Sequence, residues 1–232
     1  MKKKIIALCL VVALAATAIV GGTLAYFTDT DEATNTFTVG NVDIELVEKN
    51  LDGTPFTPDQ PLMPGSKTQN NIAKIVTVKN TGKSDAYMWI EVWVPAALDD
   101  GDDNSPTAPG LGNSLHFNYG ATVEETKSTY LGSKKIGDVS YHGYVHFVKN
   151  DTAKKANEST VALLDQVYMD SKVTQCTDAT HTNCMILADG QTHYTGDWNL
   201  VINAVGFQAD GIDSIQTAIS TYYSKTVGDY LW

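Results

Sequence analysis

The segment 87–94 constrains the fold more than any other, because it alternates like a β-strand and is largely apolar on both faces. Successive side chains of a strand point to opposite faces, so Tyr87, Trp89 and Trp93 would share one face. The other face would carry Met88, Ile90, Val92 and Val94. Such an aromatic stripe is more typical of a sandwich core, or of a groove that receives another chain, than of a sugar-stacking platform. A carbohydrate platform stays open as the alternative.

Strand patterns dominate the rest of the chain as well. Alternating or β-branched runs predict further strands at 42–46, 75–79, 141–148, 162–169 and 198–207. A turn signal, Asn80-Thr81-Gly82, separates 75–79 from 87–94 and predicts that they form a hairpin. One helix is predicted, at the last element, where Asp213 is the expected N-cap and Gln216 lies three residues on. The fold class is therefore mostly β with a short C-terminal helix.

Residues 1–25 have the order of regions found in a secretory signal peptide. Three lysines precede an uncharged, mostly apolar run from Ile5 to Val20, and small residues follow it. We expect signal peptidase to cut between Ala25 and Tyr26, because Thr23 and Ala25 occupy the two small-residue positions before that bond. If uncut, the longer stretch from Ile5 to Ala25 would be about 31 Å long as a helix, enough to span a bilayer, so a membrane anchor stays open. The leader therefore predicts a protein that is exported from the cytoplasm.

The charge of the exported part is strongly negative. The chain has 16 Lys plus Arg and 27 Asp plus Glu, and every basic residue is a lysine. Three lysines lie in the leader, so residues 26–232 have a net charge of −14. This charge makes nucleic acid and anionic membrane surfaces poor partners, and leaves the leader as the only expected membrane contact. The lack of arginine also disfavours a phosphate-handling active site.

Two cysteines, Cys176 and Cys184, remain after the leader and are separated by seven residues. An exported pair this close is predicted to form a disulfide. The alternative is a metal site that adds His181, but no second cluster completes a tetrahedral ligand set. We therefore favour the disulfide.

The region near 95–140 is predicted to be an exposed acidic insertion, since residues 99–114 are rich in Asp, Asn, Gly, Pro and Ser. Clustered carboxylates favour calcium, but an EF-hand register would place Ser105 where glycine is required and Leu111 where the bidentate Glu belongs. A looser calcium site stays open, with a solvated loop as the alternative. Its ligands would be Asp99, Asp100, Asp102 and Asp103.

The sequence predicts no catalytic, metal or cofactor-binding residues. It lacks His-Glu-x-x-His, and its one closely spaced histidine pair, His142 and His146, falls in a predicted strand. Four residues of strand separate Cα atoms by ~13 Å, which is too far for one zinc ion to bridge. The sequence also lacks the Gly-x-Ser-x-Gly motif of a nucleophile elbow. The chain is accordingly not expected to be an enzyme.

Three blocks resemble the TasA/camelysin family of secreted proteins from Gram-positive bacteria, which an ER-type signal peptidase releases. The leader junction 21–29 and the following segment 37–44 are similar to the start of that family's mature domain. Residues 63–65, 76–82 and 86–94 resemble its Pro-Gly, strand, Asn-x-Gly, strand core. The third block, 204–218, resembles a strand-to-helix corner of exported proteins that share this leader.

The resemblance implies a jelly-roll-like antiparallel β-sandwich at 41–232, with long loop insertions, that polymerises into extracellular biofilm-matrix or cell-surface fibres. Residues 26–40 would be a donor strand that completes the sheet of the next subunit. Its partners would be further copies of the chain and other matrix proteins, with signal peptidase acting during export. Two alternatives stay open: a monomeric surface adhesin or carbohydrate-binding module, and a camelysin-like metalloprotease. The candidate donor residues are Tyr26, Phe27, Phe37 and Val39.

Overall fold

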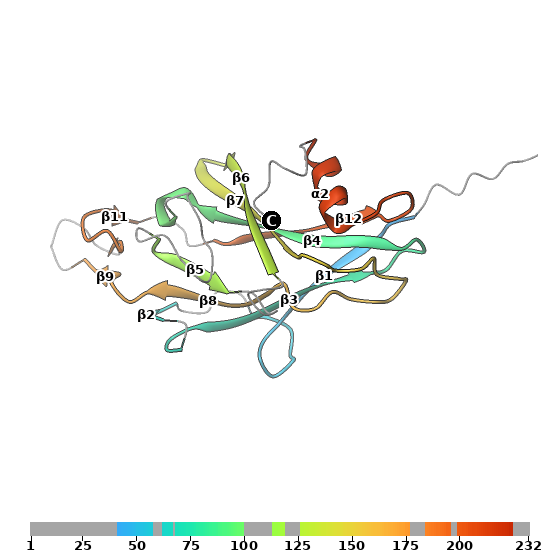
Figure 1. The fold of residues 1–232 in the computed structure, drawn as a ribbon. Coiled ribbons are helices and arrows are strands. Elements are labelled where there is room, and N and C mark those ends of the chain that lie inside the picture. Colours follow the sequence, from blue (N-terminus) through green and yellow to red (C-terminus); the bar gives the residue numbers. More distant parts are fainter. Residues whose placement is uncertain are drawn as a thin grey trace, which may run out of the picture. The chain divides into compact units, whose positions relative to one another are not determined.

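A computed structural model describes residues 41–57, 62–66, 68–99, 113–118, 126–176, 184–195 and 199–224 (Figure 1). These residues belong to one compact unit that covers 40–232. Nearly all the described elements are strands, and α2 (Ile215–Tyr222) is a short helix near the C-terminus. The prediction of a mostly β fold with antiparallel sheets and a short C-terminal helix is confirmed. Within the described residues, no helix has the length and hydropathy of a membrane span.

Two larger sheets carry the fold. The first sheet has the strand order β1, β3, β8, β2, and β5 also pairs with β8. All its pairings are antiparallel except the short one between β2 and β8. Its strands are β1 (Ile44–Lys49), β2 (Pro64–Gly65), β3 (Ile72–Asn80), β5 (Leu115–Asn118) and β8 (Leu164–Asp170).

The second sheet is wholly antiparallel and has the order β12, β4, β7, β6. Its strands are β4 (Ala86–Pro95), β6 (Thr126–Ile136), β7 (Val139–Val148) and β12 (Val201–Gln208). The short 3-10 helix η1 (Ala96–Leu98) follows β4. A small third sheet consists of β9 (Thr174–Gln175), β10 (Met185–Ile186) and β11 (His193–Tyr194).

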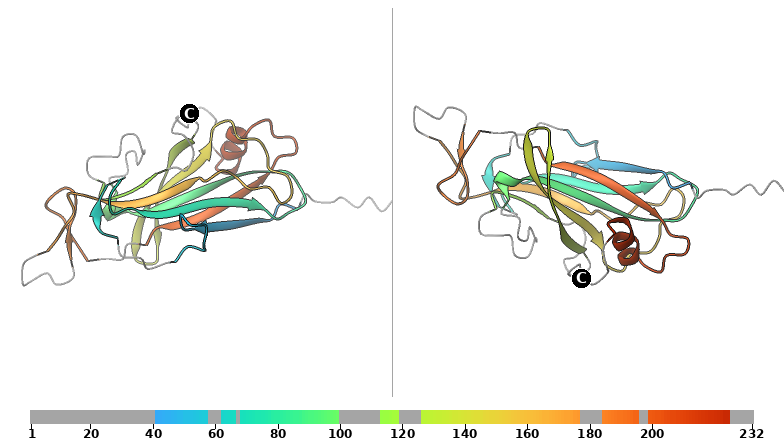
Figure 2. Two further views of the ribbon diagram at one scale, coloured as in Figure 1. Left: turned by 90° about the horizontal axis from the view of Figure 1, so that it is seen from below. Right: turned by 90° about the horizontal axis from the view of Figure 1, so that it is seen from above.

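The main core lies between the two larger sheets, which Figure 2 shows in two further views. Val76 and Val78 of β3 pack there with Met88, Ile90, Val92 and Val94, the even-numbered face of β4. Nine of the ten residues of β4 are buried, so the opposite face of this strand is covered too. The helix α2 supplies this cover, and Trp89 packs there with Ile215 and Ile219 of the helix. The two-sided apolar pattern of β4 thus predicts its central place.

The predicted hairpin between 75–79 and 87–94 is wrong, because β3 and β4 lie in different sheets. The connection 81–85 instead crosses from one sheet to the other. A hairpin would leave one apolar face of β4 with no sheet or helix against it, whereas the crossing places that face in the core between the sheets. Such changes of sheet between consecutive strands recur at β4 to β5, β5 to β6 and β7 to β8.

The region near 95–140, predicted as an exposed acidic insertion, contains buried segments and a strand of the second sheet. Leu98 and Asp99 are buried, and so is every residue of β5. Residues 126–136 form β6, an 11-residue strand that pairs along β7. The prediction from composition failed because this polar region also contains β5 and β6, which pair with strands of the two sheets. Residues 100–112 lie outside the described part of the chain.

Smaller corrections concern the ends of elements. Ser214, not Asp213, caps α2, since its Oγ accepts a hydrogen bond from the Thr217 backbone N–H. Gln216 donates its side-chain amide to the Lys149 carbonyl instead of closing a capping box. The first predicted strand, 42–46, is observed two residues later, at 44–49. The strands predicted at 141–148 and 162–169 correspond to β7 and β8.

Candidate functional site

The sandwich has two ends that the strand directions define. At the Asn80 end, β3 finishes, β4 begins and β12 finishes; at the Asp99 end, β4 finishes and β7 begins. The described chain starts at the Asn80 end, where residues 41–43 lead into β1. Any segment that precedes residue 41 therefore joins the domain there.

Backbone hydrogen bonds clamp this start of the domain. The Asp43 carbonyl accepts from the backbone N–H groups of Thr81 and Gly82, and the Asn41 carbonyl accepts from those of Lys83 and Ser84. Gly82 permits the close approach, since a Cβ there would lie 2.4 Å from the Asn41 carbonyl oxygen. The Asn-x-Gly turn thus serves to hold the incoming chain.

Asn80 organises the same end from within. It is fully buried, and its amide donates to the Ser84 and Lys154 carbonyls at 2.8 Å each. Its side-chain oxygen accepts from the Gly82 N–H at 2.9 Å. A buried amide is stable when its donors and acceptor are paired in this way. The sequence predicted the turn at Asn80 correctly, but it did not predict that the Asn80 side chain is buried and bonds to three backbone groups.

The two long sides of the sandwich differ. On one side, β1 packs on β12: a Cβ at Gly206 would lie 2.7 Å from Ile44 Cγ2, so the isoleucine side chain rests on the glycine backbone. On the other side, β5 ends the first sheet and β6 ends the second. Among the described residues, neither pairs with a further strand on its outer edge. Free strand edges can accept another strand.

The aromatic stripe of β4 is buried and is not a sugar-stacking platform. Tyr87, Trp89 and Trp93 are only 9%, 0% and 7% exposed. Trp93 lies flat against Gly143 of β7, where a Cβ would be 2.4 Å from the indole ring, and Lys134 Nζ lies 3.4 Å from the ring centroid. The core interpretation of this stripe is confirmed.

Glu91 is the polar centre of that buried face. Its carboxylate accepts hydrogen bonds from Tyr223 Oη at 2.7 Å, Trp93 Nε1 at 3.0 Å and Asn203 Nδ2 at 3.3 Å. Trp89 Nε1 donates in turn to Tyr223 Oη at 3.2 Å. Burial raises the pKa of Tyr223, and the neighbouring Glu91 raises it further. The sequence signal for this network was Glu91, a single acidic residue in an otherwise apolar strand face. The network joins the end of α2 to the sheet.

A polar cluster lies in the sandwich at the Asp99 end. The fully buried Asp99 carboxylate accepts hydrogen bonds from Tyr144 Oη and from His142 Nδ1, the latter at 2.9 Å. Asp99 was a candidate calcium ligand, but one of its oxygens already has these two donors. The Leu98 carbonyl accepts from the Ser114 N–H at 2.9 Å, so the chain on either side of 100–112 is joined at its base.

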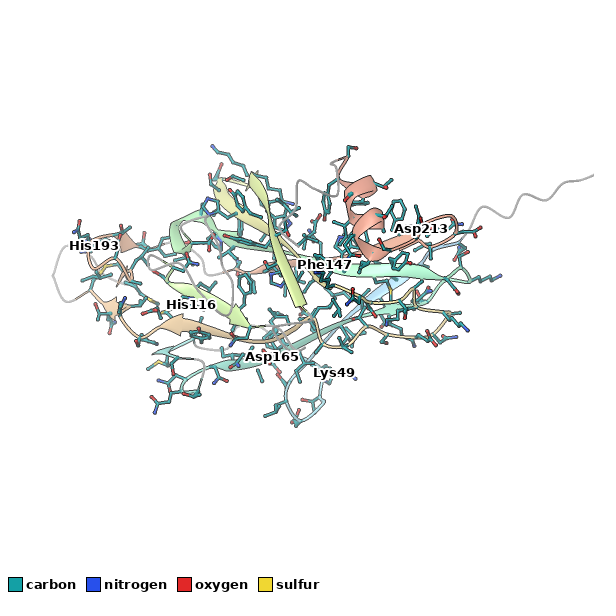
Figure 3. The ribbon with its side chains drawn as sticks, in the orientation of Figure 1. Lys49, His116, Phe147, Asp165, His193 and Asp213 are labelled. Carbon is teal, nitrogen blue, oxygen red and sulfur yellow. A yellow bond between two sulfur atoms is a disulfide. The ribbon has the colours of Figure 1, made fainter. Side chains whose placement is uncertain are left out.

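Three histidines on β5 and β7 lie in different surroundings. His116, labelled in Figure 3, stacks on Tyr168 and lies 3.1 Å from Asp170 Oδ2; burial lowers its pKa, and Asp170 offsets part of that shift. His146 is completely buried beside Phe117, and burial lowers its pKa to about 3. His142 has the Asp99 contact described above. His142 and His146 lie in a strand, as predicted, four residues apart.

The disulfide region lies beside the Asp99 end. Cys176 and Cys184 are bonded, with Cα atoms 5.4 Å apart. The small sheet that they staple packs its Met185 against Met169 and Val173. Ser114 Oγ accepts from the Ala188 N–H at 2.9 Å, which ties this region to β5. His181, the third residue of the alternative metal site, lies outside the described residues.

Several other predicted site residues lie outside the described part of the chain. These are the cleavage pair Ala25 and Tyr26, the other donor-strand residues Phe27, Phe37 and Val39, and the acidic residues Asp100, Asp102 and Asp103. Within the described ranges, no group of three or more His, Cys, Asp or Glu side chains is placed to hold a metal ion. The described geometry offers strand edges and a clamped chain start rather than an assembled reaction centre.

The family described as camelysin metallo-endopeptidase matches residues 1–86. This match confirms the resemblance to the TasA/camelysin family over the leader, the segment 26–40 and the chain through β3 to the start of β4. No curated protein matches the chain.

Proposed function

We propose that this chain is a secreted structural subunit of extracellular matrix or cell-surface fibres, in which residues 26–40 of one subunit add a strand to the next. The observation that carries the proposal is the family match over residues 1–86, which includes the leader and the whole candidate donor segment. The leader pattern supports export, and the acidic surface supports a soluble precursor.

The described fold is compatible with donation. Every described strand of both sheets begins at Ile44 or later, and the side chains of these strands form the main core between the sheets. The clamp on Asn41 and Asp43 fixes the point from which the preceding segment starts. An anchored start gives the donor segment a defined origin on its own subunit, as head-to-tail assembly requires.

The energetics also favour assembly. An added strand would make about eight backbone hydrogen bonds at ~1 kcal/mol net each, and burial of Tyr26, Phe27, Phe37 and Val39 would contribute ~1.5–3 kcal/mol per side chain. Salt screens the repulsion between exposed acidic surfaces beyond ~10 Å. Association of these acidic subunits is therefore favourable in spite of their charge.

A metallopeptidase is the second candidate, because the matching family carries that description. The histidine that a sequence scan would choose first, His142, contacts the buried Asp99 carboxylate, and His146 is enclosed in the core. These contacts favour a structural role for both. Chelator-sensitive cleavage of casein by the pure protein would support the peptidase and count against the structural proposal.

Electron microscopy of purified residues 26–232 tests the proposal directly. We expect fibres from this protein, and no fibres after deletion of 26–36. A deletion variant that is folded by circular dichroism and polymerises like the longer protein would contradict strand donation. A soluble monomer with glycan affinity would instead favour the adhesin.

A further inference from the structure

We infer that the acceptor for residues 26–39 of a second copy is the open side of the sandwich between β5 and β6, where an added strand would extend the first sheet beyond β5. This inference rests on the proposed function and assigns it a surface. Its central feature is a strip on the inner face of β6, which we define as Ser128, Tyr130, Ser133 and Lys135.

Strand register places the strip on the inner face. Ser128, Tyr130, Ser133 and Lys135 pair with His146, Tyr144, His142 and Ser140 of β7, respectively. Antiparallel partners share a face, and Tyr144 belongs to the main core, so the strip faces the space between the sheets. The irregularity between Tyr130 and Gly132 keeps Ser133 on the same face as Tyr130.

The strip extends past the strands that cover the rest of the inner face. The first sheet ends at β5, which has only four residues, whereas β6 has eleven. Phe117 of β5 reaches Tyr144 and His146 of β7, with ring centroids 6.0 and 4.9 Å away. Tyr130, one strand further out, is 38% exposed although it packs on His142 and Tyr144. One more strand beside β5 would cover it.

Within the described part of the chain, polar side-chain atoms along this side lack hydrogen bond partners. Ser128 Oγ is buried, and no described residue bonds to it. Asn118, on the edge strand β5, is 2% exposed, and neither its side-chain oxygen nor its nitrogen bonds to a described residue. Buried polar groups are normally paired, because leaving one unpaired is unfavourable. The segment 26–39 is rich in side chains that pair with such groups, with five threonines and one asparagine.

Charge favours the same occupant. Lys134 and Lys135 lie together on β6, and Lys135 is exposed. The segment 26–39 has three acids, Asp29, Asp31 and Glu32, and no basic residue. In a subunit of net charge −14, this basic edge is a favourable place for an acidic strand of another copy. The opposite side offers less space, because Ile44 of β1 already lies on Gly206 of β12.

Hydrogen exchange of the variant that lacks residues 26–36 tests the location, because no neighbouring copy can fill its acceptor; a synthetic 26–39 peptide is added to it. We expect the peptide to slow exchange at least tenfold in the segments 115–118 and 128–136. Slowed exchange at other strand edges only, or no binding, would overturn the inference. This result does not depend on whether the protein forms fibres, so the location and the fibre function can fail separately.

A charge swap provides the second test. Lys135→Glu should slow fibre growth or weaken peptide binding by about fivefold, because an attraction becomes a repulsion. Lys155→Glu is the matched control, an exposed lysine near the Asn80 end with the same change in net charge. A peptide with Asp29→Lys and Asp31→Lys should bind the Lys135→Glu variant more tightly than the original peptide does. The same peptide change should improve binding to the Lys155→Glu variant less, because that variant keeps Lys135. Equal effects of both lysine variants, with no rescue, would overturn the inference.

Discussion

Glu91 and Tyr223 are joined by a hydrogen bond of 2.7 Å that links the centre of β4 to the residue directly after α2, 132 positions later in the chain. The bond lies on a face that also buries Trp89 and Trp93. It holds α2 against the second sheet, because the Tyr223 hydroxyl contacts both Glu91 and Trp89.

Removal of this bond should loosen α2. We expect Tyr223→Phe to lower the free energy of unfolding by ~1.5–3 kcal/mol, since the hydrogen bond is to a charged acceptor in a partly buried site. Urea denaturation, followed by tryptophan fluorescence, measures the change. Tyr222→Phe is the control, because Tyr222 is 48% exposed. Equal loss in both variants would contradict a specific role for Tyr223.

The same residue predicts an alkaline limit of stability. The pKa of Tyr223 is raised above its ordinary value of 10.0 in the folded protein. Above pH 10 the unfolded chain loses this proton more readily, so the stabilisation is complete below pH 10 and decreases as the pH rises beyond it. Tyr223→Phe should show a smaller decrease between pH 10 and 11.5. Parallel profiles for the two proteins would argue against the raised pKa.

His146 predicts an acid limit of stability. Its pKa is about 3 when folded and 6.5 without the effect of burial. The unfolded chain binds the proton more readily between these values, so the contribution of His146 is complete above pH 6.5 and falls by up to ~1.4 kcal/mol per pH unit below it. His146→Phe should flatten the profile of unfolding free energy against pH from 6.5 to 4. A profile as steep as that of the original protein would contradict this origin.

Gly143 is required by the Trp93 side chain. In Gly143→Ala the new Cβ would lie 2.4–2.6 Å from three ring atoms, so the indole must move away from its contacts with Lys134 and Glu91. We expect a loss of ~1–3 kcal/mol in unfolding free energy and a shift in tryptophan emission. Ser140→Ala, at an exposed site of the same strand, should have little effect. Unchanged emission in Gly143→Ala would mean that the ring is not packed there.

The Cys176–Cys184 bond should staple only its own region. Mass spectrometry without reduction should find the intact protein two hydrogens lighter than its reduced form. Replacement of both cysteines by serine should destabilise the small sheet by ~2.5 kcal/mol on the chain-entropy estimate for a short loop. Limited proteolysis should then cut first between 170 and 195, and cleavage that begins elsewhere would contradict a local role.

The amino terminus of the secreted protein is predicted to be Tyr26. The small residues Thr23 and Ala25 precede that bond, and the apolar run ends just before them. Amino-terminal sequencing of secreted material decides this prediction. A chain that retains Met1 and fractionates with membranes would indicate an uncleaved anchor.

The strand character of the chain and the burial of β4 on both faces could be predicted from the amino-acid sequence. Alternation of apolar residues is a local signal, and it placed β4, β7, β8 and the helix α2 to within a few residues. The disulfide between Cys176 and Cys184 and the turn at Asn80 were also predicted correctly, because short cysteine spacing and turn residues are local properties of the sequence.

The pairing of the strands, by contrast, depends on contacts between segments that are distant in the sequence. The turn after β3 could have closed a hairpin or crossed between sheets, and the choice depends on covering both faces of β4, which involves α2 more than 120 residues away. Burial of β5 and Asp99, within a polar stretch, depends in the same way on partners from β7 and β8. The candidate acceptor side exists because β5, the edge strand of the first sheet, is shorter than β6, the edge strand of the second. No single segment of the sequence encodes this difference, because it depends on how the two sheets pack together.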